Sequence, residues 1–116
     1  MAGDDIDLIC AVAHDTMRSY RSALGEPLLP SWKRAPKWMK EATRSSVTDI
    51  LAHPGQTAQM QHEQWVAQKR NAGWTTGPIK DARKKTHPLL VAYNELDPAE
   101  RRKDALMIAV VTALSS

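Results

Sequence analysis

The chain of 116 residues has no phenylalanine, a single cysteine and no long apolar run. A membrane span needs about 20 predominantly apolar residues in a row, so we expect no transmembrane helix and no membrane partner. One cysteine, Cys10, excludes an internal disulfide and suits a reducing compartment. The acidic start of the chain also differs from the basic segment that opens a secretory signal. We therefore expect a cytoplasmic protein in which Cys10 is buried on a helix as a small apolar residue.

The motifs of the common enzyme classes are missing as well. The sequence contains no P-loop, no dinucleotide-binding glycine pattern and no nucleophile elbow. Its four histidines do not have metal-ligand spacing. The formal net charge is only +3, which permits attraction to phosphates but is low for a nucleic-acid-binding protein. We predict a protein that is not an enzyme, needs no cofactor or metal, and does not bind nucleic acid.

Apolar residues at three- and four-residue steps predict helices in the first half of the chain. The first helix is expected to run from about Asp5 to Leu24 and to end at Gly25, which suits the left-handed C′ position. A loop with three prolines follows. The second helix is expected to begin near Pro36, at its first position, and to end at the His-Pro-Gly of residues 53–55.

Two more helices follow from their capping residues. Thr57 can cap a third helix that runs to about residue 71, with Gly73 as its stop. Asp97 and Glu100 form a capping box around Pro98 and begin the last helix. The expected buried stripe of the last helix is made of small and branched apolar residues: Ala105, Leu106, Ala109, Val110, Ala113 and Leu114.

The region between these helices has a different pattern. "GWTTGPIKD" (73–81) is rich in turn residues, and "THPLLVAY" (86–93) is extended in character. We predict that the two pair as a short β-hairpin around the loop "DARKK". The expected fold is therefore α+β and mainly helical, with about four helices and one short β-hairpin, in a single domain over residues 1–116.

Several spaced motifs resemble those of one known family. They are "HD..R.Y...LGE" (14–26), "W...P.W" (32–38), "H..W...K...GW..GP.KD...K.HPLL..Y..L" (62–96) and a Lys-Asp pair that leads into a Val and Ala-Leu run (103–114). In this order they resemble the Ry domain, a repeat found in pairs in ryanodine receptors and as single copies in bacterial and phage proteins. The resemblance covers about residues 10–114. Thr76 and Ala92 depart from it, since the family usually has Tyr and Pro there.

The resemblance implies a compact helical domain with a short hairpin and no catalytic activity. Paired Ry repeats in the receptor bind adenine nucleotides in the cleft between them, and the prokaryotic domains look like ligand sensors or adaptors. The positions that match His62, Trp65 and Lys69 line that cleft, with Arg usual where Lys69 stands. The resemblance therefore favours binding over catalysis.

The chemistry of the same three residues points the same way. His62, Trp65 and Lys69 are spaced to share one face of a helix. An indole can stack on a base, which contributes about 1–3 kcal/mol. An ammonium group suits a phosphate. An imidazole can hydrogen-bond a ribose, base or phosphate. The alternatives are that Trp65 packs in the core or an interface, that His62 is a satisfied packing histidine, and that Lys69 is solvated.

Five further residues are candidates for the same ligand site. Lys80, Lys84 and Lys85 belong to a basic loop that is either a solvated surface or a phosphate funnel. His87 either anchors the hairpin or faces the ligand. Trp32 either clamps the proline-rich loop or forms a pocket wall.

We expect a binding module for an adenine-nucleotide or ADP-ribose-type signalling ligand, acting as a sensor or by sequestering its ligand. Because a single copy lacks the tandem partner of the receptor repeats, we expect a homodimer in which both Trp65 faces contribute to the site. The alternative function is a protein–protein interaction adaptor.

Overall fold

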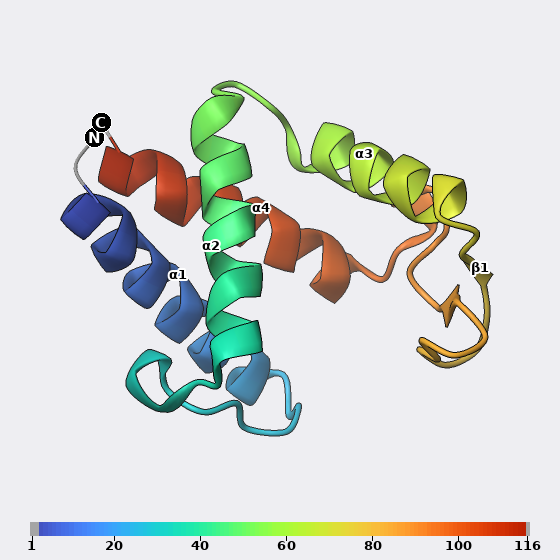
Figure 1. Cartoon of the computed structure of the whole chain (residues 1–116), viewed down its shortest axis with the longest axis horizontal. Coiled ribbons are helices and arrows are strands. Elements are labelled where there is room, and N and C mark those ends of the chain that lie inside the picture. Colours follow the sequence, from blue (N-terminus) through green and yellow to red (C-terminus); the bar gives the residue numbers. More distant parts are fainter. Residues whose placement is uncertain (1–2, 116) are drawn as a thin grey trace. The chain divides into compact units, whose positions relative to one another are not determined.

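Four helices dominate the computed structural model, which describes residues 3–115 (Figure 1). In chain order the elements are α1 (Gly3–Ala23), η1 (Trp32–Arg34), α2 (Lys37–Ala52), α3 (Ala58–Asn71), β1 (Thr75–Thr76), β2 (Thr86–His87), η2 (Tyr93–Glu95) and α4 (Pro98–Ser115), where η marks a 3-10 turn. The mainly helical α+β fold predicted from the sequence is confirmed.

The chain divides into two units, and α4 takes part in both. The second unit is Gln56–Asp104, with α3, both strands, η2 and the first residues of α4. The first unit consists of the residues before it, with α1 and α2, and the rest of α4 from Ala105 onward.

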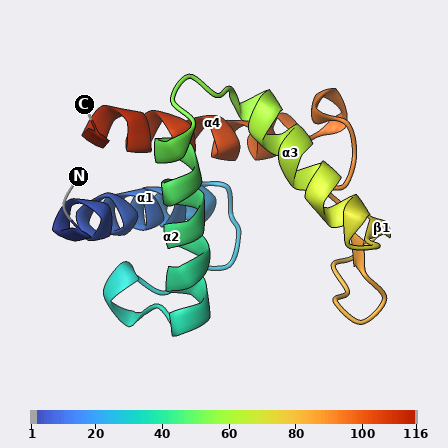
Figure 2. The same ribbon diagram turned by 45° about the horizontal axis from the view of Figure 1, so that its top comes forward.

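The first unit is built on three helices. α1 runs alongside the later part of α4, and α2 crosses both (Figure 2). The buried residues at their centre are Ile9, Cys10, Ala13, Val47, Ile50 and Val111. The side chain of Cys10 is completely buried, as expected, and burial raises the pKa of its thiol. A thiol held protonated in this way acts as a small apolar core residue.

The stop of α1 follows from its sequence. Gly25 has a φ of +82°, and its N–H donates to the Ser22 carbonyl. The N–H of Glu26 donates to the carbonyl of Arg21 at 3.0 Å. These two bonds form a Schellman motif, which satisfies carbonyl groups that a helix end otherwise leaves without partners. The predicted end of the first helix is confirmed.

The two ends of α3 also match the prediction. The hydroxyl of Thr57 accepts the N–H of Met60 at 3.2 Å, as an N-cap does. Gly73 has a φ of +90° and donates to the Arg70 carbonyl. This glycine turns the chain so that the next residue, Trp74, lies back over the last turn of α3.

The starts of α2 and α4 involve proline in two ways. Pro36 is the N-cap of α2 rather than its first helical residue, so the helix begins one position later than predicted. Pro98 is the first residue of α4, where its missing N–H costs nothing. The carboxylate of Asp97 accepts the N–H of Ala99 at 3.1 Å, which confirms Asp97 as the cap.

The buried face of α4 differs from the predicted stripe. Val111 is completely buried, and Met107, Ile108 and Val110 pack around it, whereas the predicted residues Ala105, Ala109, Ala113 and Leu114 are exposed. Apolar residues fill almost every position of this helix from 105 to 111, so their spacing alone does not select a face. Val110, a residue of the predicted stripe, does pack against the core, whereas Leu114 is exposed although its side chain is large.

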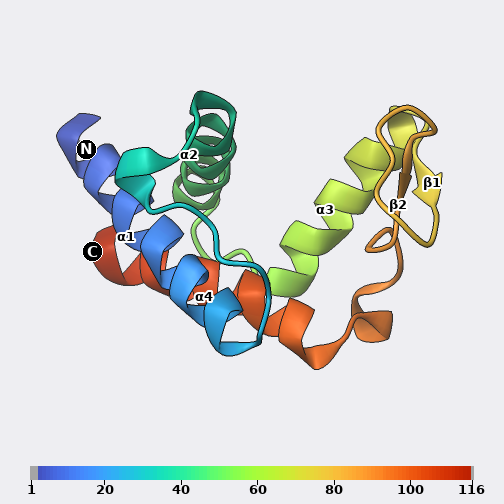
Figure 3. The same cartoon turned by 90° about the horizontal axis from the view of Figure 1, so that it is seen from below.

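The two strands lie in the predicted segments, but they pair in parallel and do not form a hairpin (Figure 3). The chain bends at residues 78–79 and turns again at 82–85. Two reversals restore the original direction, so β2 runs the same way as β1. The antiparallel pairing is confined to the bridge between Asp81 and Thr86, whose backbone groups exchange bonds of 3.0 and 3.1 Å. Pro78, which has no N–H to donate, favours the early break in β1.

Candidate functional site

Trp65 lies at the centre of an aromatic cluster in the second unit. Its ring centroid is 5.7 Å from that of His62, one turn earlier on α3. His87, at the end of β2, meets the indole edge-on at 5.0 Å. Tyr93 of η2 completes the cluster, with its ring 6.0 Å from His62. Trp65 remains partly exposed, and its ring contacts the imidazoles of His62 and His87.

Backbone hydrogen bonds hold both histidines of this cluster. His62 is 7% exposed, and its Nε2 lies 2.8 Å from the Val91 carbonyl oxygen, to which it donates. The Nδ1 of His87 accepts the N–H of Leu89 at 3.1 Å, so a proton on the neutral ring belongs on Nε2. His62 is thus a satisfied packing residue, and His87 anchors the segment that follows β2. Both roles fix the rings that flank Trp65.

Lys69 lies beside Trp74 rather than over Trp65. Its ammonium nitrogen is 4.4 Å from the centroid of the Trp74 ring, which is the geometry of a cation–π contact. The cause is the helix end, because the N–H of Trp74 donates to the Lys69 carbonyl at 2.9 Å and brings the two residues together. A contact between these two positions often accompanies a Schellman motif.

Positive charge also surrounds His87. Burial lowers the pKa of His87 below its ordinary value, and the charges of Lys80 and Lys69 lower it further, while Glu100 acts in the opposite direction. His87 is therefore a neutral imidazole at pH 7, with two ammonium groups near enough to influence it. The structure thus brings together His62, Trp65, Lys69, Lys80 and His87 from the predicted set.

The remaining predicted residues lie elsewhere or have other partners. Lys85 donates from Nζ to the Ala72 carbonyl at 2.9 Å, which helps to cap the end of α3. Lys84 is exposed in the turn, and its backbone N–H donates to Asp81. The loop therefore does not present its three lysines as one funnel.

Trp32 belongs to the first unit. Its backbone N–H donates to the carboxylate of Asp15 at 3.0 Å, and its ring lies 5.8 Å from that of His14. His14 Nε2 in turn bonds the Pro30 carbonyl at 2.8 Å. These contacts tie the proline-rich loop to α1, as the clamp interpretation of Trp32 predicted.

Sequence reasoning missed an open groove in the second unit. Its volume is about 480 Å³, and it lies between one face of α3 and the segment that includes η2. The nine residues that line it are Gln59, His62, Glu63, Val66, Arg70, Val91, Ala92, Tyr93 and Asn94. The five from α3 recur at three- and four-residue steps, a signal that marks a shared face but does not reveal a second wall.

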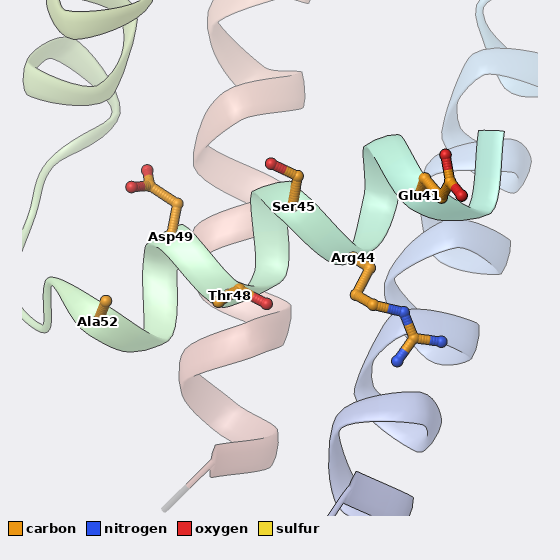
Figure 4. Close-up of a pocket in the computed structure, with 6 residues that line it drawn as sticks. All are labelled: Glu41, Arg44, Ser45, Thr48, Asp49 and Ala52. Atoms are coloured by element: carbon orange, nitrogen blue, oxygen red, sulfur yellow. The ribbon is translucent and has the colours of Figure 1, made fainter. Parts of the chain in front are cut away.

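A second depression, of about 560 Å³, lies in the first unit (Figure 4). All six of its lining residues come from α2: Glu41, Arg44, Ser45, Thr48, Asp49 and Ala52. Arg44 pairs with the carboxylate of Asp7 at 2.6 Å. A surface formed by one helix face lacks the converging groups of a binding pocket.

Two features are absent from residues 3–115. Across that range, no cluster of three or more histidine, cysteine, aspartate or glutamate side chains is arranged to hold a metal ion. None of the helices in the same range has the length and apolar character of a membrane span.

The second unit thus combines a helical scaffold with a partly exposed aromatic cluster. A family model described as the RyR domain matches residues 47–112, which is more than half of the chain. The chain belongs to this family, and the match confirms the Ry domain resemblance for the central motif at 62–96; the motifs at 14–26 and 32–38 lie outside the matched residues. It covers α3, both strands and most of α4, and therefore the whole aromatic cluster.

Proposed function

We propose that the protein is a non-catalytic binding module for an adenine-nucleotide or ADP-ribose-type ligand, with Trp65 as the surface on which the base stacks. The observation that supports this function best is the partly exposed indole held between two imidazoles, with ammonium groups close by. Such a ligand is flat at one end and negative at the other, and the site offers a matching surface for each part.

The indole of Trp65 is held in place before any ligand arrives. His62 and His87 contact the ring from α3 and β2, so little side-chain freedom remains to be lost on binding. Stacking of a base on an aromatic ring contributes about 1–3 kcal/mol. The ring of His87 is neutral at pH 7, so it adds no charge of its own to the site.

Lys69 and Lys80 supply the positive charge for the phosphates. Lys80 is exposed, whereas Lys69 lies on the Trp74 ring. If Lys69 must leave that ring to reach a phosphate, the lost cation–π contact costs about 0.5–1 kcal/mol at an exposed position. We therefore assign Lys80 the first contact with the ligand and Lys69 a supporting role.

Calorimetry with ADP-ribose and with linear and cyclic adenine nucleotides tests this function. Trp65→Ala is expected to weaken binding about tenfold or more, the equivalent of one lost stacking contact. Trp38→Ala is the matched control, because Trp38 is 68% exposed and belongs to the first unit. No heat from any of these ligands at about 100 μM protein, a threshold near −5.5 kcal/mol, would contradict the proposal.

We also propose that two copies pair so that each contributes its Trp65 surface to the ligand. Sedimentation with and without the ligand that binds best tests this step. A mass that stays monomeric at saturating ligand, with one ligand bound per chain, would contradict the homodimer while leaving the binding function intact.

The alternative function, a protein-interaction adaptor, is favoured by the groove along α3, which Trp65 and Lys69 do not line. A specific protein partner whose binding survives Trp65→Ala and Lys69→Ala would support this alternative.

A further inference from the structure

We propose that the groove along α3 binds an extended peptide segment with a basic side chain and an acidic side chain about three residues apart. This second site goes beyond the nucleotide function. The groove shares His62 and Tyr93 with the aromatic cluster, but Trp65, Lys69, Lys80 and His87 do not line it. The proposal rests on the charges, the apolar surface and the free amide of the groove.

Two residues of opposite charge line the groove on its α3 side. Glu63 and Arg70 both line it, seven residues apart on α3. At 1.5 Å of helix rise per residue, their backbones are separated by about 10 Å along the axis. A ligand that pairs with both side chains must therefore carry a positive group and a negative group about that far apart.

Both charged side chains are held by neighbours. The guanidinium of Arg70 donates to the Leu90 carbonyl at 3.2 Å, which uses one of its five N–H groups. The carboxylate of Glu63 accepts from the Gln59 amide at 3.1 Å and keeps further acceptor capacity. Positioned charges lose less conformational entropy on binding than free ones.

The other lining residues of the groove suit a polypeptide backbone. Val66, Val91 and Ala92 supply apolar surface, and the partly buried ring of Tyr93 adds to it. Within residues 3–115, no protein group hydrogen-bonds to the side-chain amide of Asn94. That amide offers donors and an acceptor, the combination that pairs with a peptide bond.

Length and charge together favour a peptide over a nucleotide. An extended chain rises about 3.3 Å per residue, so three residues span the distance between Glu63 and Arg70. A nucleotide brings only negative charge, which Arg70 attracts but Glu63 repels. The groove volume of about 480 Å³ is within the ordinary range for binding pockets.

Fluorescence anisotropy with labelled peptides tests the proposal. The probes are six-residue alanine peptides, blocked at both ends, with lysine and glutamate three positions apart in either order, and a third peptide with glutamine at both places. We expect one order to bind about tenfold more tightly than the glutamine peptide. Arg70→Gln is expected to weaken that peptide about tenfold, as for a charge-assisted bond, and Glu63→Gln about fivefold, as for an exposed ion pair.

A charge exchange makes the test sharper. In the double variant E63R/R70E the groove keeps both charges in reversed positions, so it is expected to prefer the opposite peptide order. Circular dichroism monitors the fold, and if the double variant unfolds, the single glutamine variants still decide the matter. Arg83→Gln is the matched control, because Arg83 is an exposed arginine of the same unit that does not line the groove.

The outcomes separate this proposal from the nucleotide function. Trp65→Ala is expected to weaken nucleotide binding about tenfold or more, as for one lost stacking contact, and to leave peptide binding unchanged. The peptide proposal is overturned if both charged peptides bind no better than the glutamine peptide, or if Arg83→Gln weakens binding as much as Arg70→Gln. A protein that binds the peptides and no nucleotide would overturn the nucleotide function alone.

Discussion

The rings of Trp65 and His87 meet edge to face, with their centroids 5.0 Å apart and their planes at 80°. This arrangement places the positive edge of one ring against the negative face of the other, and such pairs contribute about 0.5–1.5 kcal/mol beyond the area they bury. It joins α3 to β2, two elements that are more than a loop apart in sequence. The orientation of the proposed stacking surface therefore depends on the protonation state and position of His87.

The first prediction concerns the titration of His87. Burial, Lys80 and Lys69 lower its pKa from the ordinary value of 6.5, so in NMR its ring is expected to titrate below that value. Lys80→Gln removes one of the causes and is expected to raise the pKa. Lys84→Gln is the control. It removes a lysine that does not shift the pKa of His87, so that pKa is expected to stay unchanged.

The same shift has a consequence for stability. Between the lowered pKa of the folded state and 6.5, the unfolded chain binds more protons than the folded one. The free energy of unfolding is therefore expected to fall as the pH drops from 6.5 through the folded pKa, and this part of the dependence is expected to vanish in His87→Gln. An unchanged pH dependence in that variant would contradict the assignment.

The second prediction concerns Asp104, whose shift has the opposite sign. Burial raises the pKa of this carboxyl above its ordinary value of 3.8; His62 and Lys103 oppose the rise and Glu100 adds to it. The folded state thus holds the proton more tightly, and stability is lost as pH rises from 3.8 through the raised pKa. Asp104→Asn is expected to raise the unfolding midpoint at pH 7 and to flatten the dependence in that window.

A control distinguishes this effect from a general gain of helix stability. Thr112, on the same helix, is exposed and does not titrate, so Thr112→Ala, which favours helix, is expected to leave the pH dependence of that window in place. If Asp104→Asn unfolds at a lower temperature than the parent at pH 7, the carboxylate makes a favourable contact that outweighs its burial.

The helix ends could be predicted because they depend on neighbouring residues. A glycine at positive φ ends both α1 and α3, and Thr57 caps α3 through a bond to a residue three positions on. Each of these signals acts within one turn of helix, so no knowledge of the tertiary fold is required.

The direction of the strand pairing could not be predicted from neighbouring residues in this way. The partner of Lys69 was missed for a different reason. The direction of β2 depends on two reversals of the chain between residues 77 and 85, while the alternation of side chains is the same in a parallel and an antiparallel pair. Lys69 was placed with Trp65 from helix spacing alone. The contact with Trp74 follows from the turn at Gly73, which the sequence did predict, so this pairing could have been found.

The groove was missed for a different reason. Its α3 face is visible in the spacing of residues 59–70, but its other wall is brought there by bonds to backbone carbonyls of Leu90 and Val91. A carbonyl oxygen is present at every residue, so nothing in the sequence marks which two will accept these bonds.

The third prediction concerns Leu90, the completely buried residue at that wall. Its carbonyl accepts hydrogen bonds from both Arg70 and the hydroxyl of Thr76. Leu90 therefore contributes a buried side chain and a hydrogen-bonded backbone group. Leu90→Ala is expected to lower the free energy of unfolding by about 2–5 kcal/mol, the range for buried leucines. Ile79→Ala, at a residue that is 66% exposed, is expected to change it by about 0.5 kcal/mol or less. Equal losses in chemical denaturation would contradict the buried position of Leu90.

The fourth prediction concerns Gly77, where the parallel pair leaves no space for a side chain. A Cβ at this position would lie 2.6 Å from the Cβ of Thr86 and 3.0 Å from its methyl group. Gly77→Ala is expected to cost about 1–3 kcal/mol, as overpacking does. It is also expected to speed the hydrogen exchange of the Gly77 amide, which donates to the His87 carbonyl at 3.3 Å.

Thr86→Gly provides the matched rescue, because it removes the atoms that the new Cβ would meet. Thr86→Gly alone is expected to destabilise the chain, since it loses the bond from the Thr86 hydroxyl to the Ile79 carbonyl and adds backbone freedom. In the double variant the cost of Gly77→Ala is expected to shrink, so the two changes are not additive. Strict additivity in a double-mutant cycle would mean that Gly77 and Thr86 are not in contact and that the strands pair in another register.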